Sequence, residues 1–574
     1  MIFRHKDSDN YWYDLINLKK NTKKQSIMPK KCRYFEKKSY LCHKLCNKPK
    51  EIMYCKKIFS VSLLSLITYF GIAQNAEKEN VVRIESGLVQ GFDHEGSLGF
   101  LGIPYAKVER FMPPMPVDKW DTLMVCNHWG PMTMQPMGRE MSKAEMSEDC
   151  CVLNVWTTDR KAKKPVMLWL HGGGFDSGTS EWDPGMKLAQ KDVVCVSINH
   201  RLNILGFLDL SACSPRYKHS GNVGMMDVVA ALKWIRNNIA QFGGDPDNVT
   251  VFGESGGGGK VGTLLCMPDA KDLFNKAIIL SGTILNVNTK EMTESLGKAV
   301  LAELGIPNDS IEKIKNVPYK ELYAAGQRAM GKSIGTRKPG TPMMWGFGPT
   351  PDGEILMQQP FQPGFASFSD RKPILIGTTF NELQRLTYDK PVTLEEARQQ
   401  LVPVFGDRTD EYIKAFDEAW PKHSPNDLLS ADRLFRPKTI ITADYISANR
   451  PAPTYMYMFT WKSPVHQGSV HGHELKFVFN TLHRAGRDLP NPTADDQKLA
   501  DIMSTVWSNF AHTGNPNAEG LPAWKPYNAE NGEMMIFDYN CYLRHNPDRK
   551  LEEIIDDCCF QQLKEFREKQ ATKK

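Results

Sequence analysis

The sequence predicts an α/β fold with a large, mostly parallel central sheet and helices on both of its faces. Three observations predict it. Short apolar runs of strand length recur along the chain, a segment with apolar residues at helical spacing separates two of them, and glycine-rich turns directly follow two of them. Alternation of buried strands with crossover helices is typical of a parallel sheet that is covered on both faces.

The predicted elements begin with a short hairpin over residues 81–84 and 87–91. Residues 224–235 are predicted to form a helix that crosses between two strands, because their apolar positions recur at helical spacing. The apolar runs predicted to be buried strands are residues 165–170, 193–198, 249–252 and 373–376. The last of these strands follows a long segment that is predicted to be mostly helical.

The net charge of +6 is spread unevenly over the 574 residues. Residues 1–57 contain 16 Lys and Arg and 5 Asp and Glu, a balance of +11. The remainder therefore has 72−16=56 basic and 66−5=61 acidic residues, a balance of −5. A mildly acidic body gives no reason to expect a nucleic-acid partner.

The N-terminal segment has the pattern of a secretory signal that begins late in the chain. Two lysines precede an apolar run over residues 58–72, and Ala73 and Ala76 follow as small cleavage residues. The run is shorter than the roughly 20 residues that span a bilayer. We therefore expect a signal peptide over residues 53–76, an exported protein that is periplasmic or secreted, and no membrane span in the mature chain. The alternatives are a buried helix or a retained anchor.

This signal sets the expected domain boundaries. Met53 is a natural start, so residues 1–52, which are rich in lysine and lack apolar periodicity, are expected to be a disordered upstream extension that is not native. The globular domain is expected over residues 77–560, with a polar tail over residues 561–574.

A nucleophile motif follows the predicted strand that ends at Phe252. Residues 253–257 read GESGG and fit the pattern G-x-S-x-G, in which a strand turns sharply into a helix with a strained serine at the apex. Glycine on either side removes Cβ atoms that would clash as the two elements close up. The hydroxyl of Ser255 is therefore predicted to lie exposed at the carboxyl end of the sheet, where open α/β folds place their ligands.

A second glycine run follows the predicted strand 165–170. It reads HGGGF from His171, and such a run lets backbone N–H groups approach a substrate oxygen closely. The N–H groups of Gly173, Gly174 and Gly256 are predicted to hold the oxyanion of a tetrahedral intermediate. A plain glycine turn is the alternative. A phosphate loop requires a Gly-Lys-Ser/Thr ending, which this run does not have.

A serine nucleophile needs a base and an acid that orients the base. In folds with this serine motif they follow in the order serine, acid, histidine. Glu382 comes just after the predicted strand 373–376, at the same rim of the sheet as Ser255, and His471 lies in a loop and precedes a glycine. We predict His471 as the base and Glu382 as its orienting acid. His466 and His473 are the alternatives for the base, and Asp352 is the alternative for the acid.

With these motifs, the sequence resembles the type B carboxylesterases, a family that includes cholinesterases and bacterial para-nitrobenzyl esterases. The resemblance covers roughly residues 80–540. The segments that carry it are LGIPYA (101–106), SEDCCVLNVW (147–156), NHRL (199–202), LGFL (205–208), QFGGDP (241–246), GESGG (253–257), HGHEL (471–475) and FAHTGNP (510–516).

The resemblance implies an α/β-hydrolase fold and hydrolysis of a small-molecule carboxylic ester through a covalent acyl-enzyme, with no cofactor and no metal. Two other functions stay open: a non-catalytic adhesion or scaffold member of the same fold, and a lipase, thioesterase or amidase. The implied triad and oxyanion donors are Ser255, Glu382 and His471, and Gly173, Gly174 and Gly256.

Two positions near the implied triad depart from the family pattern. The family has alanine after the nucleophile, but here Gly256 opens a run of glycines that ends at Gly259. Each glycine weakens a helix start by roughly 1 kcal/mol relative to alanine. We expect that this helix lies so close to a neighbouring strand that only glycine fits at these positions. The family's acid precedes glycine, whereas Leu383 follows Glu382.

A third departure concerns the segment between Cys126 and Cys151. Thr133 stands where the family has the cysteine that would pair with Cys150, so Cys126 is the alternative partner of Cys150 or Cys151. Nine cysteines follow the leader, an odd number that cannot all pair, and we expect one linked and one free thiol in each adjacent pair.

The loop between Thr133 and Cys150 is also short. The matching loop of cholinesterases is long and carries an aromatic residue for the choline cation, so choline specificity is not expected. Methionines adapt to irregular apolar surfaces, and those of this loop are expected either to pack on the core or to form a pliable pocket wall. They are Met132, Met134, Met137, Met141 and Met146.

Overall fold

The computed structural model describes residues 80–136, 145–335, 346–361, 364–383 and 390–559, all within the unit Asn80–Lys574. The expected extension (1–52), signal peptide (53–76) and polar tail (561–574) lie outside these residues, so they and the export of the protein remain predictions. Among the described residues, no helix combines the length and the apolar character needed to cross a bilayer.

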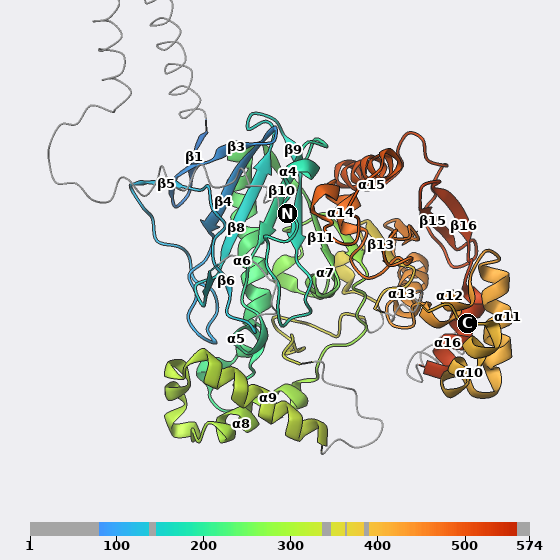
Figure 1. Cartoon of the computed structure of the whole chain (residues 1–574). Helices are drawn as coiled ribbons and strands as arrows, with labels where there is room; N and C mark the ends of the chain where they lie inside the picture. The colour runs from blue at the N-terminus through green and yellow to red at the C-terminus, as the bar shows by residue number, and fades with distance from the viewer. Residues whose placement is uncertain (1–79, 137–144, 336–345, 362–363, 384–389, 560–574) are drawn as a thin grey trace, which may run out of the picture. The chain divides into compact units, whose positions relative to one another are not determined.

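An 11-stranded mixed sheet runs through this unit in the order β16-β15-β14-β13-β12-β11-β9-β10-β8-β4-β3 (Figure 1). Seven neighbouring strands are parallel: β15 (Glu533–Phe537), β14 (Thr454–Phe459), β13 (Ile374–Thr379), β12 (Lys276–Leu280), β11 (Gly244–Glu254), β9 (Lys164–Leu170) and β10 (Val194–Ile198). The strands at the two edges pair antiparallel: β16 (Tyr542–His545), β8 (Val152–Thr157), β4 (Ser97–Pro104) and β3 (Phe92–His94). The predicted fold class is confirmed.

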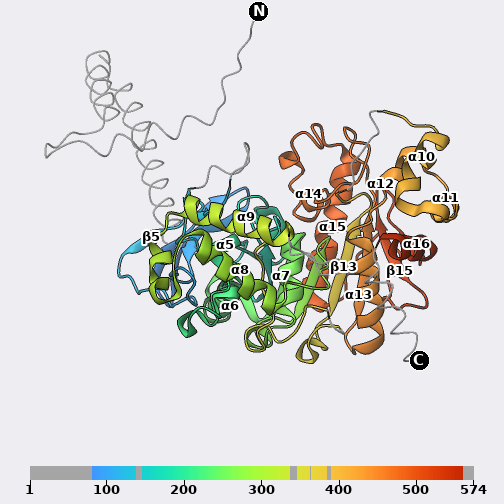
Figure 2. The same ribbon diagram turned by 90° about the horizontal axis from the view of Figure 1, so that it is seen from below.

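Successive side chains of the central strands point to opposite faces of the sheet, as strand geometry requires. Leu168 and Val251 belong to one apolar core, and their chain neighbours Trp169 and Phe252 belong to the other. The first core contains residues of α6 (Val223–Asn238), α7 (Gly256–Leu264) and α13 (Arg436–Asn449), and the second contains residues of α4 (Met186–Ala189), α14 (Leu475–Val478) and α15 (Ala494–Thr513). In Figure 2, β13 lies between α13 and α15, one helix from each layer.

The predicted strands and the crossover helix are confirmed, with shifted ends. The hairpin is β1 (Val81–Ile84) paired antiparallel with β2 (Gly87–Gln90), to which the short β5 (Leu123–Val125) adds in parallel. β11 begins at Gly244, earlier than predicted, because it pairs with β9 across an irregularity between Gly244 and Val249. The middle segment expected to be mostly helical also contains β12.

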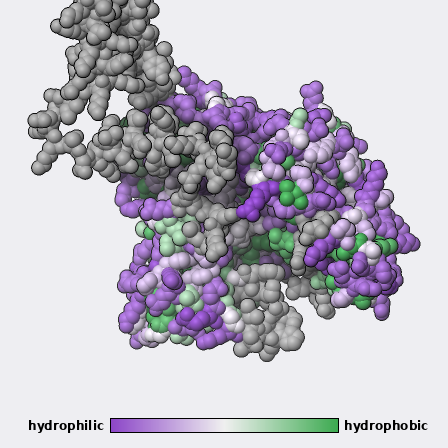
Figure 3. Space-filling view, in the orientation of Figure 1, coloured by the Kyte–Doolittle hydropathy of each residue, from purple (hydrophilic) through white to green (hydrophobic). Residues whose placement is uncertain are grey.

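Most of the remaining α-helices lie in two groups (Figure 1). α8 (Lys290–Glu303) packs against α9 (Tyr319–Gly335), and the second group comprises α10 (Leu394–Phe405), α11 (Thr409–Ala419), α12 (Pro425–Ser430) and α16 (Arg549–Cys559). α5 (Asn203–Phe207) packs on α6, and a two-stranded pair joins β6 (Met132–Thr133) to β7 (Met146–Ser147). The face in Figure 3 is mostly hydrophilic, with apolar side chains exposed between polar ones.

The cysteines from Cys126 onward are all described, and all are free thiols. The alternative link between Cys126 and Cys150 or Cys151 is absent, and the expectation of one linked thiol in each adjacent pair is wrong. The hydroxyl of Thr133, which stands where the family has a cysteine, lies 3.0 Å from the sulfur of Cys150. The sulfur of Cys126 faces the carbonyl oxygen of Met124, 3.8 Å away.

Candidate active site

Ser255 stands at the tight turn between β11 and α7. Its backbone has φ 55° and ψ −123°, in the positive-φ region that residues other than glycine rarely adopt. Its N–H donates to the carbonyl of Leu280 (2.9 Å), and its carbonyl accepts from the N–H of Gly259 (3.0 Å). The strained turn is therefore held from both sides. This strand–turn–helix geometry is the context that the serine motif requires.

The glycines around Ser255 are needed because backbone approaches them closely. A Cβ atom on Gly257 would lie 1.9 Å from the carbonyl oxygen of Leu170, at the end of β9. One on Gly256 would lie 2.1 Å from the carbonyl oxygen of Gly174. The expected close contact between helix and strand is confirmed for Gly257, and at Gly256 the neighbour is the glycine loop that follows the strand.

The loop after β9 presents unpaired backbone N–H groups. Gly173 and Gly174 have φ values of 85° and 64°, which glycine adopts without strain. The carbonyl of Gly173 accepts from the N–H of Ser177 (3.0 Å), which closes the turn. No hydrogen bond from the N–H of Gly173 or Gly174 occurs within the described residues. Gly256 begins α7, so its N–H has no acceptor inside the helix. The three predicted oxyanion donors thus lie together.

Glu382 and His471 are in direct contact. Nδ1 of His471 lies 2.5 Å from Oε2 of Glu382, whose side chain is fully buried. The second carboxylate oxygen of Glu382 accepts the N–H of Thr379 (2.7 Å), and the N–H of His471 donates to the carbonyl of Glu382 (3.1 Å). Two backbone contacts thus fix both partners beyond the end of β13. Leu383 is 59% exposed, so the side chain that replaces the family's glycine points to solvent without crowding the pair.

The other imidazole nitrogen of His471 faces the residue before the nucleophile. Nε2 lies 3.1 Å from Oε1 of Glu254. Within the described residues, neither this nitrogen nor that oxygen makes a hydrogen bond of acceptable geometry, and no hydrogen bond joins His471 to the hydroxyl of Ser255. The structure therefore pairs the predicted base with its acid, and not with the serine. Catalytic hydrogen bonds are commonly long or poorly aligned before substrate binds.

The alternative bases are engaged elsewhere. His466 is exposed, and its Nε2 lies 3.0 Å from Oδ1 of Asp488. His473 is buried, and its Nδ1 accepts the N–H of Val470 (3.3 Å). Neither imidazole contacts Glu382, so the structure favours His471 for the position beside the acid.

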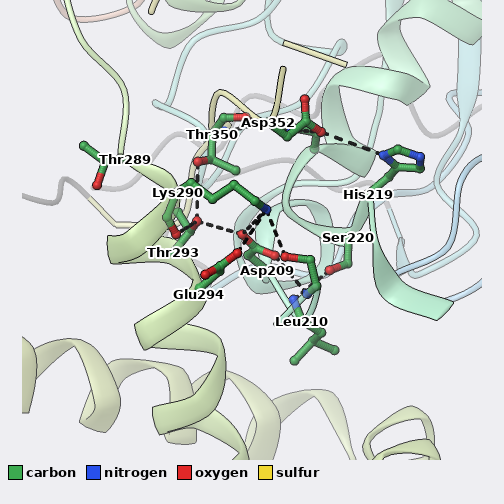
Figure 4. A network of polar contacts seen from close by, with 12 residues as sticks. Asp209, Leu210, His219, Ser220, Thr289, Lys290, Thr293, Glu294, Thr350 and Asp352 are labelled. Atoms are coloured by element: carbon green, nitrogen blue, oxygen red, sulfur yellow. Dashed lines mark hydrogen bonds and ion pairs between the residues drawn. The ribbon is translucent and has the colours of Figure 1, made fainter. Parts of the chain in front are cut away.

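The alternative acid, Asp352, belongs to a different polar network (Figure 4). One of its carboxylate oxygens accepts the N–H groups of Glu354 and Ile355, and the other lies 3.8 Å from Nδ1 of His219 and accepts from the side chain of Asn222. Figure 4 shows it beside the N-terminal end of α8, which Thr293 links to Asp209 with a 2.8 Å hydrogen bond. Asp352 therefore stabilises its own loop and makes no contact with Glu382 or His471.

Two carboxylates beside His471 control its charge. Burial disfavours the imidazolium, but Glu254 and Glu382 outweigh this penalty and raise the pKa of His471 to about 9. Burial in turn raises the pKa of Glu254 to about 7. A histidine held between two acids is thus stabilised in its protonated form, the form that a general base reaches after it has accepted a proton.

Sequence reasoning missed three residues around His471. Glu254 and Glu474 are buried acids inside the quoted motifs, and Oε1 of Glu474 accepts the hydroxyl of Ser281 (3.3 Å). Glu254 directly precedes Ser255 and Glu474 lies three residues after His471, and these positions were a signal that both acids belong to the site. The ring of Phe435 stacks on the imidazole of His471, with centroids 4.9 Å apart and planes inclined by 11°. No pattern in the sequence points to Phe435.

A surface pocket of about 630 Å³ lies beside α6, away from these groups. Tyr105, Met226, Trp234 and Met267 are among its lining residues, and none of the predicted triad or oxyanion residues contributes to it. It is therefore not the substrate pocket of the serine site. Within the described ranges, no cluster of histidine, cysteine, aspartate and glutamate is arranged to hold a metal ion.

Comparisons with known proteins identify the family of this chain. The model of the carboxylesterase family matches residues 78–552. The para-nitrobenzyl esterase of Bacillus subtilis (strain 168) is 35% identical over 491 residues, which cover 82% of this chain and 96% of that protein. The fumonisin B1 esterase of Sphingopyxis macrogoltabida is 34% identical over 493 residues, covering 81% and 87%.

A solved structure gives the same result. The esterase of Clostridium hathewayi, described as able to hydrolyse aliphatic aromatic polyesters, superposes with a TM-score of 0.75 at 33% identity and covers 83% of this chain and 98% of its own. The family resemblance, the α/β-hydrolase fold and the esterase activity predicted from the sequence are thereby confirmed. The chain belongs to the carboxylesterase family and is a serine-dependent carboxylic ester hydrolase.

Proposed function

We propose that Ser255 is the nucleophile of this esterase, that His471 is its general base and acid, and that Glu382 orients His471. The observation that carries the proposal is the 2.5 Å contact between Nδ1 of His471 and the buried carboxylate of Glu382. This contact directs Nε2 toward the end of β11, where Ser255 occupies its strained turn. An acid in this position selects the tautomer with the proton on Nδ1 and stabilises the imidazolium.

The proposed reaction has two halves. Oγ of Ser255 attacks the ester carbonyl carbon while Nε2 of His471 takes its proton, and the N–H groups of Gly173, Gly174 and Gly256 stabilise the oxyanion. The C–O bond to the alcohol breaks, and His471 returns the proton to the leaving oxygen. His471 then takes a proton from a water molecule, whose oxygen attacks the acyl carbon. The bond from this carbon to Oγ of Ser255 breaks, and His471 returns the proton to Oγ, which releases the carboxylic acid and restores the serine.

A fluorophosphonate probe tests the nucleophile directly. Such probes phosphonylate an activated serine hydroxyl and leave ordinary serines unmodified. We expect one adduct per chain, located on Ser255 by peptide mass spectrometry, and none after heat unfolding. An adduct on another serine would overturn the assignment, and a complete lack of labelling would favour a non-catalytic scaffold.

The pH dependence of kcat/KM tests the base. His471 must be neutral to accept a proton, and its pKa of about 9 predicts that kcat/KM rises with pH and levels off only above about pH 9. Glu254→Gln removes a negative charge that favours the imidazolium, so the pKa of His471 falls and the rise moves to lower pH.

The pH profile is measured with a p-nitrophenyl ester. Glu418→Gln serves as the control, because it changes an exposed carboxylate on α11, and its profile should match that of the wild type. A Glu254→Gln profile that stays in place would show that Glu254 does not set the charge of His471.

A further inference from the structure

Lys260 is a fully buried lysine on the helix that follows the nucleophile. It lies four residues after Gly256 on α7, so the two residues share one face of that helix. That face meets the loop that carries two of the three proposed oxyanion donors, because a Cβ atom on Gly256 would lie 2.1 Å from the carbonyl oxygen of Gly174.

The side chain of Lys260 ends on two carbonyls of this loop. Its Nζ donates to the carbonyl oxygens of His171 (3.0 Å) and Gly174 (2.9 Å). These two carbonyls bracket the turn that contains Gly172, Gly173 and Gly174. The ring of Phe175 lies 5.6 Å from the same nitrogen, and the described residues provide Lys260 with no salt bridge. A buried amine without a carboxylate partner is unusual, so its two backbone contacts need an explanation.

Among the titratable groups around Lys260, the carboxylate of Glu254 favours its ammonium form. The imidazole of His171 stacks on that of His200, with centroids 5.2 Å apart, and burial lowers the pKa of His171 to about 3, so this ring stays neutral. Burial also lowers the pKa of Lys260 to about 7. Since an ammonium and a neutral amine can each donate two hydrogen bonds, the two contacts persist in either form.

We infer that Lys260 is a positioning residue that holds the oxyanion loop against α7 and so aims the N–H groups of Gly173 and Gly174 at the substrate oxygen. The inference rests on the proposed function, since it assigns these N–H groups to the oxyanion hole. It also explains Gly256, because an alanine there would push the carbonyl of Gly174 away from α7 and from Lys260.

Lys260→Met removes the amine and keeps the length of the side chain. Oxyanion contacts strengthen in the transition state, so kcat should fall while KM stays nearly unchanged. A misplacement of about 1 Å can lower the rate about 100-fold, and we expect a loss of kcat of about this size, expressed per site titrated with a fluorophosphonate. The inhibition constant of a trifluoromethyl ketone, which forms an oxyanion on the serine, should rise by the same factor.

Lys372→Met is the matched control. Lys372 is also a buried lysine whose Nζ donates to two carbonyls, those of Lys271 (2.6 Å) and Phe274 (2.5 Å), with the Phe274 ring 4.5 Å away. None of these groups belongs to the site. We expect this variant to lower Tm and to leave kcat and the ketone inhibition constant unchanged.

The outcomes separate the inference from the proposed function. Equal kcat losses in the two lysine variants, a loss confined to KM, or a wild-type inhibition constant in Lys260→Met would overturn the role of Lys260. An active Ser255→Ala variant would instead overturn the proposed function. Should Lys260→Met yield too little folded enzyme, Lys260→Gln retains a shorter donor, and an intermediate loss of kcat is expected of it.

Discussion

Replacing Ser255 by alanine is expected to lower kcat by about 10⁶, because the variant has no hydroxyl to form the acyl-enzyme. Folding should change little. Among the described residues, the hydroxyl of Ser255 makes no hydrogen bond, and alanine has to adopt the same positive φ as serine. We therefore expect a change in unfolding free energy of about 0.5 kcal/mol or less, measured by denaturant titration alongside hydrolysis of a p-nitrophenyl ester.

Ser447→Ala provides a control for the loss of a hydroxyl. Its Oγ donates to the carbonyl of Asp444 (3.1 Å) within α13, away from the site, so this variant should hydrolyse the ester at the wild-type rate. If Ser255→Ala kept a tenth of wild-type kcat, the nucleophile would have to be another group.

Replacing His471 by alanine is expected to cost about as much, again about 10⁶ in kcat, since the serine then lacks its base. Nucleophile and base act as one unit, so the double variant Ser255→Ala/His471→Ala should be no less active than either single variant. His471→Ala also leaves Oε2 of the buried Glu382 carboxylate without its imidazole partner, while Oε1 keeps the N–H of Thr379. The unfolding free energy should therefore fall by about 1–3 kcal/mol, which Ser255→Ala does not cause.

His466→Ala is the matched control for this prediction. It removes an imidazole that is also paired with a carboxylate, 3.0 Å from Asp488, but that pair is exposed and lies outside the site. We expect wild-type kcat and a stability change of less than about 1 kcal/mol, as for surface ion pairs. Additive losses in the double variant would mean that His471 and Ser255 act in separate steps.

Much of the fold could be predicted because its signals are local. The runs that became β9, β10 and β13 are almost entirely apolar, as is typical of strands that are buried on both faces of a sheet. β12 was missed because its five residues, KAIIL, are too few to distinguish a buried strand from a helical turn. The early start of β11 depends on its pairing with β9, which the local sequence does not encode.

The residues of the site also differ in whether a local motif predicts them. Ser255, Gly173, Gly174 and Gly256 stand in glycine-rich motifs. Because glycine is required by local backbone geometry, the sequence alone determined where the sharp turn at Ser255 and the glycine loop after β9 occur. The same motifs established the family.

Contacts between distant segments were decided only by the tertiary structure. It brought His471 to Glu382 across 89 residues of chain, placed Glu254 against the same imidazole, and left Asp352 in another network. It also set Lys260 beneath the glycine loop that follows β9 and left the cysteines of the described residues unpaired. The physical reason is that hydrogen bonds, ion pairs and disulfides depend on distances of a few ångströms between side chains, and those distances follow from the packing of the whole sheet and its helices.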